Sequence, residues 1–109
     1  MKKMFAAIKS IENKDEIISG LNHWECFEEL FKRNGVSDAN DGFLKFSGLY
    51  ENGFVDENNN WYSREDAMKI AAENDLIRPD MDMNIQDDID FHGGLVAEAL
   101  KPEVRKIQK

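Results

Sequence analysis

The chain has few residues that could cross-link it or interrupt its elements. It contains one cysteine, Cys26, and two prolines among 109 residues. A single cysteine excludes a disulfide within the chain and is typical of a reducing compartment. No apolar run approaches the roughly 20 residues of a membrane helix. The opening segment MKKMFAAIKSIENK becomes polar too early for a secretion signal. These absences predict a cytoplasmic protein.

Positive charge is also scarce. Fourteen Lys and Arg residues face 22 Asp and Glu, which gives a net charge of −8 and a pI of about 4.7. Such a field repels nucleic acid phosphates and anionic lipid, so we expect neither nucleic acid nor membrane as a partner. The basic residues gather near both ends, and residues 80–90 hold five Asp with no Lys or Arg. This uneven distribution leaves room for a local basic pocket that binds a small anion.

Apolar and aromatic residues are plentiful in comparison. Hydrophobic residues make up 41% of the chain, with two Trp, two Tyr and seven Phe. This length fits one domain, residues 1–109, and a domain of this size leaves a large share of its surface exposed. The aromatic content therefore indicates a homo-oligomer that covers part of that surface.

Local patterns predict a hairpin and two main helices. The segments 4–10 and 16–20 are typical of strands joined by a turn. Apolar residues recur at helical spacing in 22–35, where Asn22 is a suitable N-cap. Ser63 begins a second helix that extends to residue 75.

The remaining segments carry weaker signals. We expect 36–55 to be irregular with short extended pieces, and its end, 53–55, to pair with 61–62 in a hairpin. The sequence of 76–94 predicts a loop or arm. The sequence of 94–101 predicts a short helix that ends before Pro102. The predicted fold class is α+β: a small antiparallel sheet packed with two main helices and a short C-terminal helix.

Calcium binding is one candidate for the Asn-rich segment. Asp56, Asn58 and Asn60 alternate as in a calcium loop, but Trp61 and Ala67 occupy the places that need Gly and a bidentate Glu. A turn is the favoured interpretation, because Asn tolerates positive φ. We predict no metal site.

Catalysis has two further candidates. A Nudix-like hydrolase needs several carboxylates on one helical face, and the helix after Arg64 spaces them badly. Cys26 follows His23 by three residues, yet its apolar neighbours predict a buried, inert thiol. We therefore predict no catalytic residue. His92, beside two glycines, fits either a phosphate contact or an ordinary loop.

The aromatic pair Trp61 and Tyr62 has two interpretations. Adjacent strand residues point to opposite faces, so one ring turns away from the core. An exposed ring beside Arg64, at a helix start, could stack on a base while the guanidinium holds phosphate. Alternatively, both rings fill a core or a dimer contact, and residue types alone favour this second reading.

The order of motifs resembles a known family. The segments AAIKS, IISGLNHWECF and GFVDENNNWYSREDAMKIA are similar to those of small bacteriophage-encoded proteins that include the Thoeris anti-defence sponge. The resemblance covers roughly residues 6–77. It implies sequestration of glycocyclic ADP-ribose signals, and in some members cyclic dinucleotides, in the cytoplasm of the infected host cell.

Several positions match the family motifs directly, namely Gly20, His23, Gly53, Phe54, Arg64, Glu65, Ala67, Ile70 and Ala71. Trp61 stands where the family usually has Phe. Asn22 replaces a frequent Arg, Asn59 or Asn60 replaces a turn Gly, and Asp75 falls near a usual Gln. If that Arg contacts phosphate in relatives, the resemblance does not carry their ligand preference over to this chain.

The resemblance implies binding without catalysis or cofactor, in an oligomer built from dimers, with a hexamer as one option. The expected ligand-binding residues are Asn22, His23, Trp61, Tyr62, Arg64, Asn74, Arg78 and Arg105. Two rival functions remain: an acidic DNA mimic or direct protein inhibitor of a host defence enzyme, and a metal-dependent nucleotide hydrolase.

Overall fold

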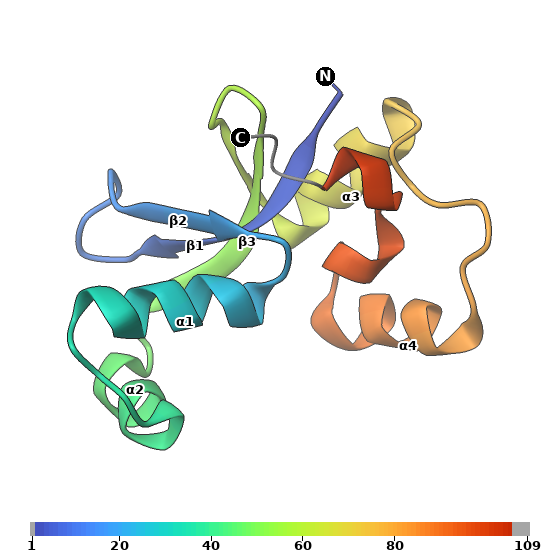
Figure 1. Cartoon of the computed structure of the whole chain (residues 1–109). Coiled ribbons are helices and arrows are strands. Elements are labelled where there is room, and N and C mark those ends of the chain that lie inside the picture. The colour runs from blue at the N-terminus through green and yellow to red at the C-terminus, as the bar shows by residue number, and fades with distance from the viewer. Residues whose placement is uncertain (1, 106–109) are drawn as a thin grey trace.

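A four-stranded antiparallel sheet organises the computed structural model, which describes residues 2–105 (Figure 1). The strand order is β2-β1-β3-β4, so β1 and β3 are central. This confirms the predicted α+β class and both predicted hairpins. The strands are β1 (Met4–Ser10), β2 (Ile17–Gly20), β3 (Tyr50–Asp56) and β4 (Trp61–Ser63).

The two faces of the sheet have different roles. Ala6 lies opposite Phe54, and both belong to the hydrophobic core that the helices cover. The next position along β3, Val55, pairs with Trp61 of β4. Because side chains alternate along a strand, Val55 and Trp61 lie on the face away from that core.

Between residues 2 and 105 the structure contains four α-helices and two short 3₁₀ helices: α1 (His23–Arg33), α2 (Ala39–Phe46), α3 (Arg64–Glu73), α4 (Met83–His92), η1 (Ala97–Ala99) and η2 (Pro102–Val104). The predicted N-caps of α1 and α3 are confirmed. The Asn22 side chain accepts a hydrogen bond from the Glu25 N–H, and that of Ser63 accepts one from the Asp66 N–H. None of these helices is long and apolar enough to span a membrane.

Three segment predictions were wrong. The segment 36–55, expected to be irregular, contains α2, and the expected arm 76–94 contains α4. The expected helix at 94–101 is instead a single 3₁₀ turn, η1, between the extended residues Val96 and Leu100. Tertiary contacts explain this last difference. Leu100 forms a bridge with Ile77, and the Arg78 N–H donates to the Ala99 carbonyl.

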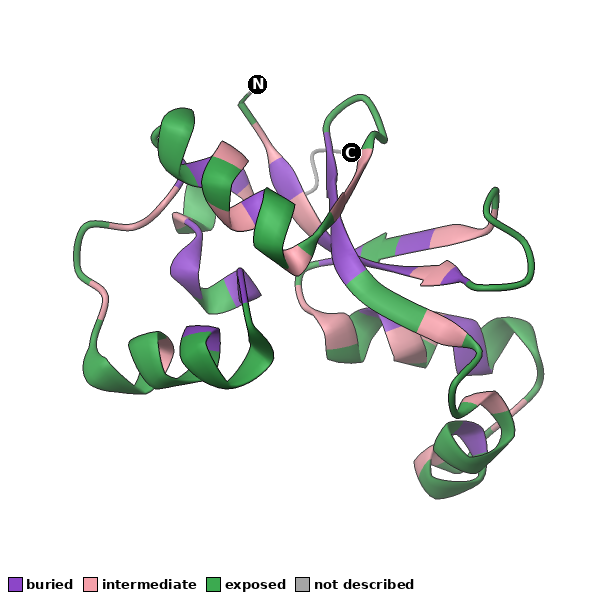
Figure 2. Ribbon diagram, turned by 180° about the vertical axis from the view of Figure 1, so that it is seen from behind, coloured by how far each residue is buried: buried purple, intermediate pink, exposed green. Residues whose placement is uncertain are grey.

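Residues 94–101, here called the C-terminal segment, are part of the core. Leu95, Ala99 and Leu100 are fully buried, and Figure 2 shows the segment in purple between α3 and α4. Its backbone is tied to α3 through a hydrogen bond from the Leu95 N–H to the Arg64 carbonyl, at 2.9 Å. The position of Arg64 therefore depends on residues about 30 positions further along the chain.

The Asn-rich turn between β3 and β4 is closed by the buried carboxylate of Asp56. It accepts hydrogen bonds from the backbone N–H groups of Asn58 and Asn60, the Asn60 amide and the Tyr62 hydroxyl. Burial alone would raise the pKa of Asp56, but these hydrogen bonds hold it below its usual value. The carboxylate that suggested a calcium loop thus stabilises a hairpin, with Asn59 at positive φ as expected.

Gly94 permits the close approach of the C-terminal segment to α3. A Cβ atom at this position would lie 2.4 Å from the carbonyl carbon and 2.5 Å from the carbonyl oxygen of Arg64. We expect Gly94→Ala to lower the free energy of unfolding by about 2–3 kcal/mol, because backbone atoms must move. Urea titration followed by tryptophan fluorescence measures this.

Gly93→Ala is the matched control. Gly93 has a φ of 72°, but a Cβ atom there meets nothing within 4 Å. Its substitution should cost only about 1 kcal/mol, for the left-handed backbone alone. Equal losses for the two variants would contradict the proposed crowding at Gly94.

Candidate functional site

A pocket of about 440 Å³ lies where the first residues of α1 and α3 meet α4 and the C-terminal segment. Both helices direct their positive ends toward it, which favours negative charge nearby. Asn52 of β3 contributes to its lining. The lining residues are Asn22, His23, Trp24, Asn52, Arg64, Asp88, His92, Val96, Ala97 and Glu98.

His23, the first residue of α1, is fixed by contacts on both sides of its ring. Its Nε2 lies 2.8 Å from the Gly53 carbonyl oxygen, and its ring packs edge-on against Phe54 with centroids 5.2 Å apart. A carbonyl only accepts hydrogen bonds, so Nε2 carries the proton. Nδ1 is then an acceptor, and it faces Arg64 at 3.4 Å from Nη2.

Arg64, the first residue of α3, reaches into the pocket from a half-buried position. Its Nη1 donates to the Leu95 carbonyl at 2.8 Å, while the Leu95 N–H donates back to the Arg64 carbonyl. Burial lowers the pKa of Arg64. Within residues 2–105, Arg64 takes part in no ion pair with a carboxylate. The pocket therefore contains a partly desolvated cation that forms no direct ion pair within the described residues.

The two tryptophans lie on different sides of the molecule. Trp24 lines the pocket with half of its surface exposed, and its ring packs on Phe43 at 5.8 Å. Trp61 was expected to stack on a ligand beside Arg64, but the alternation of β4 places it on the opposite face of the sheet. There it covers Gly53 and carries Lys9 4.6 Å above its ring.

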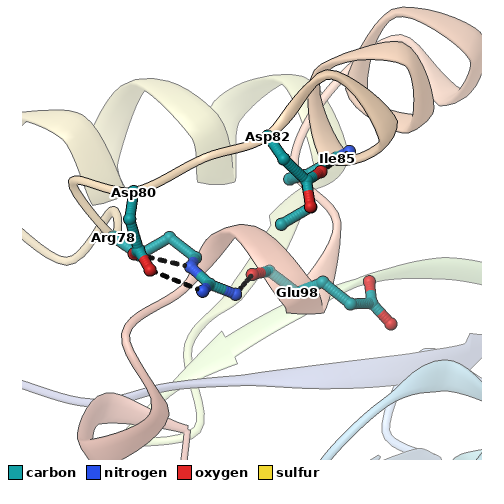
Figure 3. Close-up of polar contacts among 5 residues, drawn as sticks. All are labelled: Arg78, Asp80, Asp82, Ile85 and Glu98. Carbon is teal, nitrogen blue, oxygen red and sulfur yellow. Dashed lines mark hydrogen bonds and ion pairs between the residues drawn. The ribbon is translucent and has the colours of Figure 1, made fainter.

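The four other expected residues are not among those that line this pocket. The Tyr62 hydroxyl donates to Asp56, and the Asn74 amide donates to the Ile70 carbonyl at the end of α3. Figure 3 shows Arg78 bound through two nitrogens to the Asp80 carboxylate. Arg105 donates to the Ala97 carbonyl and lines a neighbouring pocket of about 280 Å³ that also includes Asn22.

The structure thus brings together three of the eight expected residues, Asn22, His23 and Arg64, in one pocket. It adds residues that the sequence gave no reason to choose, chiefly Trp24, Asp88 and Glu98. His92, whose role was open, lies in the same pocket. Its position beside Gly93–Gly94 was the one available signal, because paired glycines favour close backbone approach.

Cys26, the other candidate for chemistry, is buried in the core as expected. Its Sγ contacts the Ala6 carbonyl at 3.4 Å. Burial, with a smaller contribution from Glu25, raises the pKa of the thiol to about 12. The thiol is therefore protonated and inert at neutral pH. Within residues 2–105, no group of three or more His, Cys, Asp or Glu side chains is arranged to hold a metal ion.

The electrostatics of His23 follow from its position. Burial is the main cause that lowers its pKa from 6.5 to about 4. The hydrogen bond to Gly53 opposes this shift, whereas the charges of Arg64 and His92 add to it. His23 is therefore neutral at physiological pH and serves as a hydrogen-bonded support for Arg64.

This shift makes stability depend on pH. Between pH 6.5 and about 4 the unfolded chain binds a proton at His23 that the folded chain does not. The stability that the folded state gains from neutral His23 is thus complete above pH 6.5 and is lost as the pH falls through this range. We expect a loss of about 2–3 kcal/mol in the free energy of unfolding, measured by urea titration from pH 7.5 to 4.5.

Two variants isolate the effect. His23→Gln can still donate to the Gly53 carbonyl but does not titrate. It should therefore reduce the pH dependence of the free energy of unfolding between pH 7.5 and 4.5. His92→Gln should retain most of the pH dependence, because burial of His23 is the main cause of its pKa shift and the charge of His92 is the last and smallest of the causes. An equal pH dependence in wild type and His23→Gln would contradict the assignment.

No protein-family model, no curated protein and no solved structure matches this chain.

Proposed function

We propose that this protein is a viral counter-defence protein that captures a cyclic nucleotide signal in the His23–Arg64 pocket and holds it unchanged. The observation that carries the proposal is the Arg64 guanidinium, which faces a pocket without an ion-pair partner within residues 2–105. A partly buried cation is costly unless it is paired. An arginine fork is also suited to phosphate, which it binds through two parallel hydrogen bonds.

Hydrogen bonds fix the Arg64 guanidinium before any ligand binds. Leu95 fixes one end of the guanidinium and His23 supports the other. The neutral state of His23 matters, because a protonated ring would place a second positive charge beside Arg64. A preformed guanidinium loses little conformational freedom on binding, which favours affinity and slow release.

Trp24 supplies the surface on which a base can stack. The ring lines the same pocket as Arg64 and is half exposed. Base–aromatic stacking contributes roughly 1–3 kcal/mol. The expected combination of an aromatic ring and an arginine is thus retained, with Trp24 in the role that was expected of Trp61.

The state of the two candidate catalytic side chains supports capture rather than nucleophilic attack. Cys26 is buried with a raised pKa, and both ring nitrogens of His23 are engaged. Neither side chain is available as a nucleophile or general base.

Assembly is part of the proposal. Several large apolar side chains are exposed on the surface of the chain, and a homo-oligomer built from dimers would cover some of them. They include Phe43 and Leu44 on α2 and Met83 and Phe91 on α4. The protein would act in the cytoplasm of the infected host cell, where the signal accumulates.

The decisive experiment is capture and release. The purified protein is incubated with glycocyclic ADP-ribose or a cyclic dinucleotide and freed of unbound ligand. It is then heat-denatured, and the released material is analysed by mass spectrometry. Wild type should release intact ligand. Trp24→Leu should weaken binding by roughly 10-fold or more through lost stacking, and Arg64→Lys should do so through the lost fork.

Trp61→Leu is the matched control for Trp24→Leu, because it removes the same ring from the opposite face of the sheet. It should leave ligand retention unchanged, and circular dichroism would establish that all three variants are folded. Altered ligand in the released material would contradict capture and point to acid–base chemistry by Asp88 or His92. Absence of any retained ligand would favour the DNA mimic or direct inhibitor.

A further inference from the structure

The pocket carries more negative than positive charge. Asp88 and Glu98 line it together with one cation, Arg64. A site for a bare polyphosphate would gather cations, since carboxylates and phosphates repel each other. The two carboxylates therefore indicate that part of the ligand is uncharged and donates hydrogen bonds.

Glu98 is held in place through its backbone. Nη1 of Arg78 contacts the Glu98 carbonyl oxygen at 3.4 Å, and the Arg78 N–H donates to the Ala99 carbonyl at 2.9 Å. Arg78 itself is fixed by Asp80. Figure 3 shows the Glu98 carboxylate extending away from this cluster. Arg78 thus anchors the segment from which Glu98 enters the pocket.

Asp88 lines the pocket from α4. It precedes Ile89, the buried residue of α4, so the packing of Ile89 fixes this turn of the helix. Within residues 2–105, neither Asp88 nor Glu98 takes part in an ion pair. The charge of Glu98 acts on Arg64, although no ion pair joins them. Both carboxylates are therefore free to accept hydrogen bonds next to the phosphate-binding guanidinium.

We propose that Asp88 and Glu98 bind the hydroxyl groups of a ribose, so that the pocket selects ribonucleotides over deoxyribonucleotides and over bare phosphates. The inference rests on the proposed function, since it assigns the sugar of a ligand whose phosphate lies on Arg64. An acidic side chain recognises ribose hydroxyls in the same chemical way in dinucleotide-binding folds. A hydrogen bond to a charged acceptor is also stronger than one between neutral groups.

The test measures two ligands on matched variants by calorimetry in EDTA. ADP-ribose carries ribose hydroxyls and phosphates, whereas inorganic pyrophosphate carries phosphates alone. Glu98→Gln and Asp88→Asn should each weaken ADP-ribose binding by roughly 10-fold or more through the lost charged acceptor. The same variants should bind pyrophosphate more tightly than wild type does, because a repelling carboxylate is gone.

Opposite changes for the two ligands support the proposal, since a general loss of structure weakens both. Asp90→Asn, on the same helix but outside the pocket lining, should change neither. Wild type should also bind ADP-ribose at least about 10-fold more tightly than its 2′-deoxy analogue.

Three results would overturn the proposal. If both ligands bind the variants more tightly, the carboxylates only repel the ligand, and the proposed capture function still stands. If ADP-ribose binds only after Mg²⁺ replaces EDTA, a cation rather than a hydroxyl bridges the carboxylates. If wild type binds neither ADP-ribose, pyrophosphate nor the cyclic nucleotides, the proposed function fails together with the ribose assignment.

Discussion

The contact between Gly94 and the backbone of Arg64 positions Arg64 and the C-terminal segment on one side of the pocket. Without a side chain at Gly94, the C-terminal segment approaches the first turn of α3 closely enough for Leu95 to exchange two hydrogen bonds with Arg64. These hydrogen bonds fix the guanidinium and also place the segment that carries Glu98 at the pocket. The same backbone contact thus positions Arg64 and the segment of Glu98, whose charge acts on Arg64. The left-handed residue that ends α4, Gly93, supplies the preceding change of direction.

The sheet contributes through its alternation. Phe54 faces the helices, where the His23 ring packs against it, and the neighbouring Gly53 offers its carbonyl to the same ring. Gly53 has no side chain on the far face, which leaves space for Trp61 to lie over it. Gly53 therefore supports the His23 ring through its carbonyl and receives Trp61 on the far face of the sheet. A residue with a Cβ atom at Gly53 would meet Trp61 and the Tyr62 carbonyl, at 2.4 and 2.5 Å.

The parts of the fold that could be predicted are those whose signals are local. Asn22 and Ser63 cap helices with apolar spacing, and two of the three strand pairs are hairpins closed by short turns. Helix α2 lacked such a signal because it contains Gly42, against which the Phe31 ring packs in space that a side chain would occupy. Helix α4 buries only Ile89, so its sequence has no apolar period to detect.

Half of the pocket comes from α4 and the segment after it, which explains why Asp88 and Glu98 were missed. The face on which Trp61 lies depends on strand register, and adjacent residues could not settle it.

A protein with a net charge of −8 must overcome long-range repulsion to hold an anionic nucleotide. Screening at physiological ionic strength acts over about 8 Å, so the repulsion mainly slows the approach of the ligand. Affinity then has to come from short-range contacts inside the pocket, where Arg64 is partly desolvated and its interactions are stronger than in water. These contacts govern the rate of release rather than the rate of encounter. Slow release is what sequestration requires, because a signal molecule is neutralised only while it stays bound. An acidic surface and a single supported arginine are therefore compatible with capture.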